Sequence, residues 1–129
     1  MKQGLMVGSK QMLKVEVTPA MFAQFEGKVV HPVYSTAMMV YHMEWVSRLI
    51  ILPFLENEEE GMGAEVSVKH LSPAPVGSEL DIQANVVSLK KNVIVTNVQV
   101  KAGERMVGTG EVTQVVLAKS KINRLISDK

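Results

Sequence analysis

The sequence predicts an α+β domain in which a strongly curved, five-stranded antiparallel sheet wraps around one long central helix. Two observations predict it. One strand-like segment and one long helical segment come first, and four further strand-like segments follow them. The helical segment is apolar almost all the way round, so it must be buried on most of its sides. A curved sheet would cover all but its far side, and a symmetric dimer would supply a second surface there.

The segments before the central helix are short. Residues 11–17 alternate apolar and polar side chains, as a half-buried strand does. Residues 18–27 predict a short helix that begins after Thr18, with a proline in its first position, and ends at Gly27. Residues 28–34 predict an extended segment, because the proline within it disfavours helix in the residue before it.

The central helix is expected to begin at a cap formed by Ser35 or Thr36 and to run to about Leu55. Pro53, near its end, lacks the amide that a helix interior needs, so we expect a kink or a break there. Residues 56–63, ENEEEGMG, predict a solvated acidic loop with two glycines. Their carboxylates do not have the spacing of metal ligands, so a metal site is not expected there.

The rest of the chain is rich in valine and predicts strands. Short polar turns join the last three strands, which indicates an antiparallel meander. Gly108 and Gly110 fall on one face of the last strand and leave room there for another element to pack closely. A short amphipathic helix is expected over residues 119–129. The predicted strands cover residues 64–71, 79–89, 92–100 and 105–117.

The composition predicts a single packed domain over residues 1–129. The chain is 47% hydrophobic, which suits a packed core and argues against disorder. Its formal net charge is +1, so no basic face is implied and we expect no nucleic-acid partner. The absence of cysteine excludes disulfides and thiolate metal sites and favours a cytoplasmic protein. No apolar run is long enough to span a bilayer, so no membrane partner is expected.

Three polar residues in the apolar helix need an explanation. His42 and Glu44 point about 200° away from each other, so they do not form an acid–base pair, and His42 is expected to be a partly buried scaffold residue with one hydrogen bond. Glu44 either forms an ordinary ion pair with Arg48, one turn later, or serves as a functional carboxylate. Thr36 either caps the helix or supplies a functional hydroxyl.

His70 ends a predicted strand on the same face as Val66 and Val68, so its imidazole should point toward the core side, where the helix lies. It is either a core histidine with its hydrogen bonds satisfied or a functional group. A carboxylate such as Glu44 converging with this imidazole would be the usual equipment for general acid–base catalysis.

The order of elements, with the turn-rich link SPAPVGS after the second strand, resembles the hot-dog fold of acyl-CoA thioesterases and dehydratases over nearly the whole chain. The finer pattern, "ST" and "MEW" in the helix and "VKH" ending the next strand, resembles the fluoroacetyl-CoA thioesterase family. This resemblance implies that Thr36, Glu44 and His70 form the catalytic set and that Gly63 lines the site. It also implies a homodimer with the site near the subunit interface, and no metal.

Two departures from that family bear on the substrate. The segment before the helix is shorter, and nothing between Phe25 and Tyr34 is aromatic, which argues against a fluorine-selective lid. Gln114 stands where the family enzyme has an arginine in its last strand, so contacts with the substrate or CoA should differ. We expect Gln114 and Gly63 to contact the substrate, and the packing of Tyr34 and Met39 to set the depth of the pocket.

We therefore predict a homodimeric acyl-CoA thioesterase that hydrolyses a small acyl-CoA to the acid and free CoA, with no cofactor beyond the CoA of its substrate. His70 would act as general base and acid, and Thr36 would position or attack the carbonyl. Glu44 would orient His70, activate water or attack as a nucleophile. Two alternatives remain open: a non-catalytic hot-dog protein that binds an acyl-CoA or small ligand, and a dehydratase or hydratase of enoyl-thioesters. The dimers could also pair into tetramers.

Overall fold

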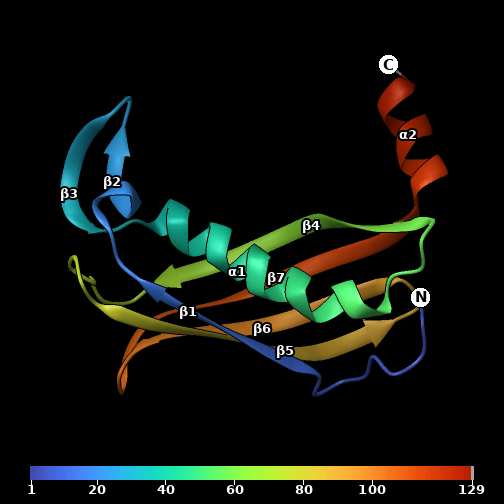
Figure 1. The fold of residues 1–129 in the computed structure, drawn as a ribbon, viewed down its shortest axis with the longest axis horizontal. Coiled ribbons are helices and arrows are strands. Elements are labelled where there is room, and N and C mark those ends of the chain that lie inside the picture. The colour runs from blue at the N-terminus through green and yellow to red at the C-terminus, as the bar shows by residue number, and fades with distance from the viewer. Residues whose placement is uncertain (129) are drawn as a thin grey trace.

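A computed structural model describes residues 1–128 and shows a curved antiparallel sheet wrapped around one long helix (Figure 1). The predicted α+β class is confirmed. The long helix, α1, contacts every strand of the five-stranded sheet. In chain order the elements are β1 (Lys10–Glu16), the 3-10 turn η1 (Pro19–Met21), β2 (Phe22–Phe25), β3 (Lys28–Tyr34), α1 (Thr36–Ile51), the 3-10 turn η2 (Leu52–Phe54), β4 (Glu59–His70), β5 (Glu79–Lys90), β6 (Val93–Ala102), β7 (Arg105–Ala118) and α2 (Lys119–Ser127).

The strands of the main sheet lie in the order β1-β5-β6-β7-β4, and all neighbours are antiparallel. The meander predicted for the last three strands is confirmed as β5-β6-β7. The strand that follows the helix, β4, pairs with β7 rather than with β5, which comes next in the chain. The two edges of the sheet are therefore β1 and β4.

Helix α1 packs close to the sheet because two glycines of β7 face it. Met39 lies over Gly108, and Met43, one helical turn later, lies over Gly110. A Cβ added at Gly108 would lie 2.7 Å from Cε of Met39, and one added at Gly110 would lie 2.7 Å from Sδ of Met43. Both methionines are fully buried. The close packing predicted for this face of the last strand is confirmed.

The prediction of a short helix over residues 18–27 is wrong. Only Pro19–Met21 form a single 3-10 turn, and the residues after it form β2, which pairs with β3 in a hairpin. Glu26 and Gly27, with φ of 54° and 77°, form the left-handed turn that a tight hairpin requires. Pairing with β3 satisfies the backbone groups of this segment, and this tertiary pairing outweighs the local helix signals.

The region after α1 also differs from the sequence prediction. The helix ends at Ile51, and η2 contains Pro53, so the expected break at the proline is confirmed although the helix is shorter than expected. The loop predicted over residues 56–63 is wrong in its second half, because β4 already begins at Glu59 and pairs there with Ala118 at the end of β7. β7 is long enough to pair with these acidic residues. Its length cannot be read from the residues of the acidic segment itself.

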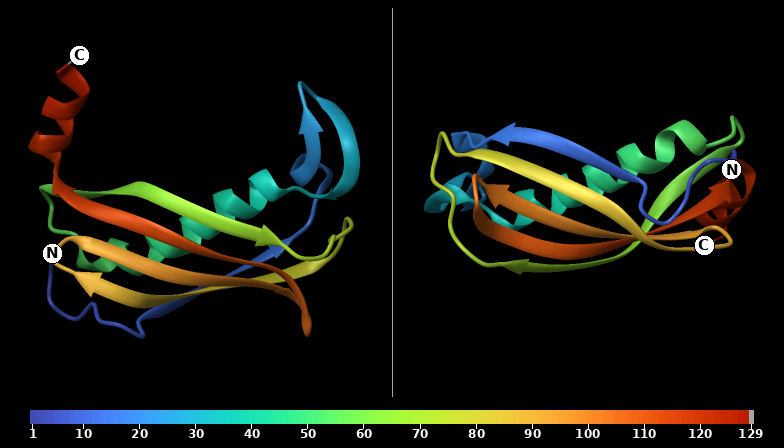
Figure 2. Two further views of the ribbon diagram at one scale, coloured as in Figure 1. Left: turned by 180° about the vertical axis from the view of Figure 1, so that it is seen from behind. Right: turned by 90° about the horizontal axis from the view of Figure 1, so that it is seen from below.

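Two elements project from the same side of the molecule at opposite ends of α1, as Figures 1 and 2 show. One is the β2–β3 hairpin. The other is α2, which has no buried residue; it confirms the expected tail helix as far as Ser127, and residue 129 lies outside the described residues. Helix α1 and the edge strand β4 lie between these projections. Within residues 1–128, no helix has the length and apolar character needed to cross a membrane.

Candidate active site

Thr36 and His70 meet at the N-terminal end of α1. Thr36 is the first residue of α1 and His70 the last residue of β4, and Oγ1 of the threonine lies 2.9 Å from Nδ1 of the histidine. The cap of α1 is Ser35, whose Oγ accepts a hydrogen bond from the amide of Met38 at 3.0 Å. Thr36 is therefore not the cap, and its hydroxyl is available to His70.

The imidazole of His70 faces inward, as predicted. Val66, Val68 and His70 are half-buried and alternate with exposed residues along β4. The Nε2 atom of His70 is buried and has no hydrogen-bond partner within residues 1–128. A buried polar atom without a partner costs free energy, so it points to a place where another group binds. When the ring proton is on Nε2, Nδ1 can accept the proton of the Thr36 hydroxyl, which is the arrangement of a base beside a nucleophile.

A buried tyrosine–histidine pair forms the wall behind His70. The hydroxyl of Tyr34 lies 2.6 Å from Nδ1 of His42, and the two rings stack with centroids 5.7 Å apart. The Tyr34 ring also meets His70 edge-on at 6.4 Å. Burial raises the pKa of the Tyr34 phenol and lowers the pKa of the His42 imidazole, so both groups are neutral near pH 7. When the ring proton of His42 is on Nε2, the phenol donates to Nδ1. The single hydrogen bond predicted for His42 is confirmed, and the side chain is buried where partial burial was expected.

Glu44 lies two turns further along α1, away from the Thr36–His70 pair. It lines a small pocket of about 80 Å³ together with Gly63 and Gln114. Gly63 is so close that an added Cβ would lie 2.9 Å from Oε1 of Glu44. Eight residues of helix rise about 12 Å, so Glu44 and Thr36 of one chain cannot both contact one small carbonyl group. The remaining residues that line this pocket are Arg48, Gly61 and Val112.

Arg48 does not pair with Glu44, although the two are one turn apart. Its Nη2 lies 2.8 Å from Oε2 of Glu60 on β4, and the same oxygen accepts the amide of Gly61 at 2.9 Å. These two hydrogen bonds hold the pKa of the Glu60 carboxyl below its usual value. Within residues 1–128, Glu44 forms no ion pair, so the ion-pair explanation of this residue is wrong. Sequence reasoning placed Glu60 in a loop, and no spacing in the sequence links it to Arg48.

The other predicted substrate contacts are buried. Tyr34 and Met39 have no exposed surface, and Gln114 is 4% exposed. Met39 lies over Gly108, which is the β7 partner of His70, so Tyr34 and Met39 line the interior next to that histidine. Gln114 belongs to the Glu44 pocket, and its Nε2 donates to the carbonyl of Ser47 at 3.1 Å.

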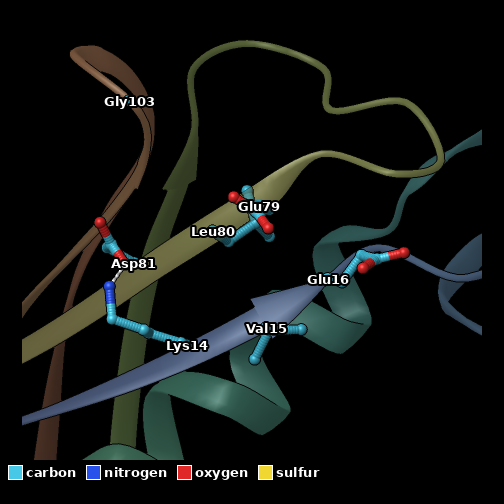
Figure 3. A pocket seen from close by; sticks show the side chains of 7 residues that line it. All are labelled: Lys14, Val15, Glu16, Glu79, Leu80, Asp81 and Gly103. Carbon is cyan, nitrogen blue, oxygen red and sulfur yellow. Dashed lines mark hydrogen bonds and ion pairs between the residues drawn. The ribbon is translucent and has the colours of Figure 1, made fainter.

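A larger pocket, of about 320 Å³, lies elsewhere, over β1 and β5 beside the β6–β7 turn (Figure 3). It contains the ion pair between Lys14 and Asp81, whose atoms are 3.0 Å apart, and Glu16 lies opposite Glu79 across the two strands. It offers neither a histidine nor a hydroxyl, so it lacks the groups for acyl transfer. Its lining residues are Lys14, Val15, Glu16, Glu79, Leu80, Asp81 and Gly103. In the described part of the chain, no three His, Asp or Glu side chains gather as metal ligands would.

Comparison with known proteins identifies one family whose match includes Thr36, Glu44 and His70. The family model of the fluoroacetyl-CoA-specific thioesterase matches residues 17–120. The fluoroacetyl-CoA thioesterase of Streptantibioticus cattleyicolor is 27% identical over 97 residues, which make up 75% of this chain and 70% of that protein. The family resemblance predicted from the sequence is therefore confirmed.

Solved structures show the same fold. A hypothetical protein of Thermus thermophilus, described as a thioesterase superfamily member, has 36% identity and a TM-score of 0.92, covering 98% of this chain and 93% of that one. A mutant of the fluoroacetyl-CoA-specific thioesterase in complex with fluoroacetate and CoA has 23% identity and a TM-score of 0.83, covering 92% of this chain and 99% of that one.

Proposed function

The chain belongs to the fluoroacetyl-CoA-specific thioesterase family and is an acyl-CoA thioester hydrolase with the hot-dog fold, and we propose that Thr36, Glu44 and His70 are its catalytic residues. The observation that carries this proposal is the 2.9 Å contact between the Thr36 hydroxyl and Nδ1 of His70 at the start of a helix. A hydroxyl, a base and free helix amides together are suited to attack on a thioester carbonyl.

His70 acts first as a base in this proposal. It takes the proton of the attacking oxygen, which is the Thr36 hydroxyl or a water molecule beside it. The amide of Met38 already donates to the Ser35 cap, which leaves the amides of Thr36 and Ala37 in the first turn of α1 to hold the negative charge that develops on the carbonyl oxygen. The C–S bond then breaks, and His70 returns the proton to the CoA sulfur. If Thr36 attacks, water then cleaves the acyl-threonine ester by the same route, and the acid is released.

Glu44 takes part through the second subunit of a homodimer in this proposal. Thr36 and Glu44 lie on the exposed side of α1, four residues before and four after Val40. If two copies of α1 run antiparallel across a two-fold axis beside Val40, Glu44 of the partner subunit faces the Thr36–His70 pair. There the carboxylate can activate water or attack the thioester itself. The two groups of site residues that lie apart in one chain would then form one site.

The surface around Glu44 supports such a dimer. Tyr41 and Trp45 on α1 are 59% and 39% exposed, and Met62 on β4 is 40% exposed. Strand β4 is an edge of the sheet, so its outer backbone groups are free to pair with another chain. Exposed apolar side chains beside a free strand edge are typical of a subunit contact. Tetramers and the cytoplasmic location stay predictions.

The size of the Glu44 pocket supports a short acyl group. Its volume of about 80 Å³ corresponds to two or three water molecules, at about 30 Å³ for each. Next to His70, the fully buried Tyr34 and Met39 fill the interior behind the imidazole, which also favours a short acyl group. We therefore propose a substrate with an acyl group of a few atoms, carried by CoA as in the complex of the related enzyme with fluoroacetate and CoA.

The test is the release of CoA thiol from a panel that contains acetyl-, fluoroacetyl-, propionyl-, butyryl- and octanoyl-CoA. We expect turnover on the short members and its loss in Glu44→Ala and His70→Ala. Wild-type turnover in both variants would show that the assignment of these residues is wrong. Tight binding of every thioester without thiol release would support the binding-protein alternative, and hydration of an enoyl-CoA without thiol release would support the hydratase.

A further inference from the structure

The carboxylate of Glu44 lies close to Arg48 but does not form an ion pair with it. Arg48 is one turn further along α1, and a glutamate followed by an arginine four residues later is the favoured order for a helix ion pair. Both side chains line the pocket next to Gly63, and both line the shallow surface on the outer side of α1 with Tyr41 and Trp45. The side chains of Glu44 and Arg48 therefore lie next to each other, but they do not form an ion pair.

Glu60 on the neighbouring strand binds this arginine instead. Its Oε2 accepts hydrogen bonds from Nη2 of Arg48 at 2.8 Å and from the amide of Gly61 at 2.9 Å. The backbone amide fixes the position of the carboxylate, so Glu60 binds Arg48 as a preorganised partner and not as a mobile surface charge. The side chains of both residues are about one-third exposed, so neither is part of the protein core.

We propose that Glu60 is a positioning residue that holds Arg48 away from Glu44 and thereby leaves the Glu44 carboxylate free to react. This inference rests on the catalytic role proposed for Glu44 and deepens it. Without Glu60, Arg48 turns to the other carboxylate within its reach, that of Glu44 one turn earlier on the helix, and forms an ion pair with it. A carboxylate bound to a guanidinium is a weaker base and a weaker nucleophile than a free one.

The expected effect follows from the strength of such pairs. Exposed helix pairs are weak, so Arg48 would occupy Glu44 for most but not all of the time, and kcat should fall roughly two- to fivefold. The loss in Glu60→Ala should also shrink as salt is added, because salt screens an exposed ion pair.

Four variants test this inference: Glu60→Ala, Glu60→Gln, Arg48→Gln and the double variant Glu60→Ala with Arg48→Gln. We expect Glu60→Ala to lower kcat, with a loss that added salt reduces, and Glu60→Gln to lower kcat less, since its amide oxygen still accepts from Arg48. Because Arg48 lines the Glu44 pocket, Arg48→Gln alone is the reference for the double variant. The two should have equal kcat, because neither has an arginine left to bind Glu44. Circular dichroism spectra and unfolding midpoints establish that each variant is folded.

The matched control is Asp81→Ala, which removes the ion pair with Lys14 at the far edge of the sheet and should change neither kcat nor its response to salt. Wild-type kinetics in Glu60→Ala would overturn the inference. A double variant slower than Arg48→Gln by the factor that separates Glu60→Ala from the wild type would overturn it too. If Glu44→Ala is inactive while Glu60→Ala is unchanged, only this inference fails. If Glu44→Ala keeps full turnover, the proposed function fails and this inference fails with it.

Discussion

The hydroxyl oxygen of Thr36 lies 2.9 Å from Nδ1 of His70, although the two residues are 34 positions apart in the chain. One residue begins a helix and the other ends a strand. The pairing of β4 with β7 and the packing of α1 on that sheet bring these two ends together. The contact between Thr36 and His70 is thus a product of the tertiary fold, and each of the two side chains can be replaced separately.

Removing the hydroxyl of Thr36 should slow the reaction without unfolding the protein. Thr36→Val keeps the shape of the side chain but cannot donate to His70, so we expect kcat to fall by roughly 10²–10⁴. Thr36→Ser keeps the hydroxyl and should lose far less. The measurement is kcat on the best short acyl-CoA. Equal activity in the valine and serine variants would contradict a role for this hydroxyl.

Mixed dimers test whether one site draws residues from two subunits. Glu44→Ala and His70→Ala homodimers should both be inactive. Unfolding and refolding them together should yield mixed dimers with one complete site each, and about a quarter of wild-type activity at equal amounts. The control is a mixture of Thr36→Val with His70→Ala, whose mutated residues lie in the same half-site, so no complete site can form. Activity recovered in the control as well would contradict this arrangement.

The buried His42 should make stability fall in mild acid. Burial lowers the pKa of His42 from 6.5 in the folded protein, so the unfolded chain binds the proton first as the pH falls. The free energy of unfolding should therefore decrease below about pH 6.5, and His42→Gln should flatten this dependence. Urea unfolding at pH 7.5 and pH 5.5 measures it. His31→Gln, at an exposed position on β3, is the control and should leave the dependence unchanged.

Gly110→Ala should destabilise the packing of α1 on the sheet. The added Cβ would meet the carbonyl of Ser67 on the paired strand and lie 2.7 Å from Sδ of Met43. The methionine can move but the backbone carbonyl cannot, so we expect a loss of at least 1–3 kcal/mol in the free energy of unfolding, as an order of magnitude. Thr109→Ala, in the adjacent position of β7, is the comparison. Equal unfolding midpoints for both variants would show that the contact is not tight.

Local patterns predicted much of this fold, because several elements carry their signal in consecutive residues. The alternation in the valine-rich strands predicted the meander and also the inward side of His70 on β4. The β2–β3 hairpin was missed because residues 18–27 contain a cap and a proline that favour a helix, and only the pairing with β3 decides against it. The early start of β4 depends in the same way on the length of β7.

The sequence selected candidate residues for the site but did not give the geometry that relates them. Spacing and resemblance selected Thr36, Glu44 and His70, and the phase of one strand placed His70 correctly. The predicted ion-pair partner of Arg48, Glu44, was wrong because helix periodicity identifies only the residues one turn away on the same helix. Glu60 reaches Arg48 through the β4–α1 packing, which no sequence spacing encodes.

The position of α1 in the chain has a consequence for protein synthesis. The helix is complete before β5, β6 and β7 have been made, and these strands carry the surface that buries Met39 and Met43. At roughly 5–20 residues per second, the ribosome needs several seconds to deliver them. Until they arrive, the nascent chain exposes an apolar helix with only β1 and β4 of its sheet made, and these two edge strands do not pair with each other. Aggregation during expression should therefore originate in this interval, and a slower-translating host should need more chaperone to produce the same yield.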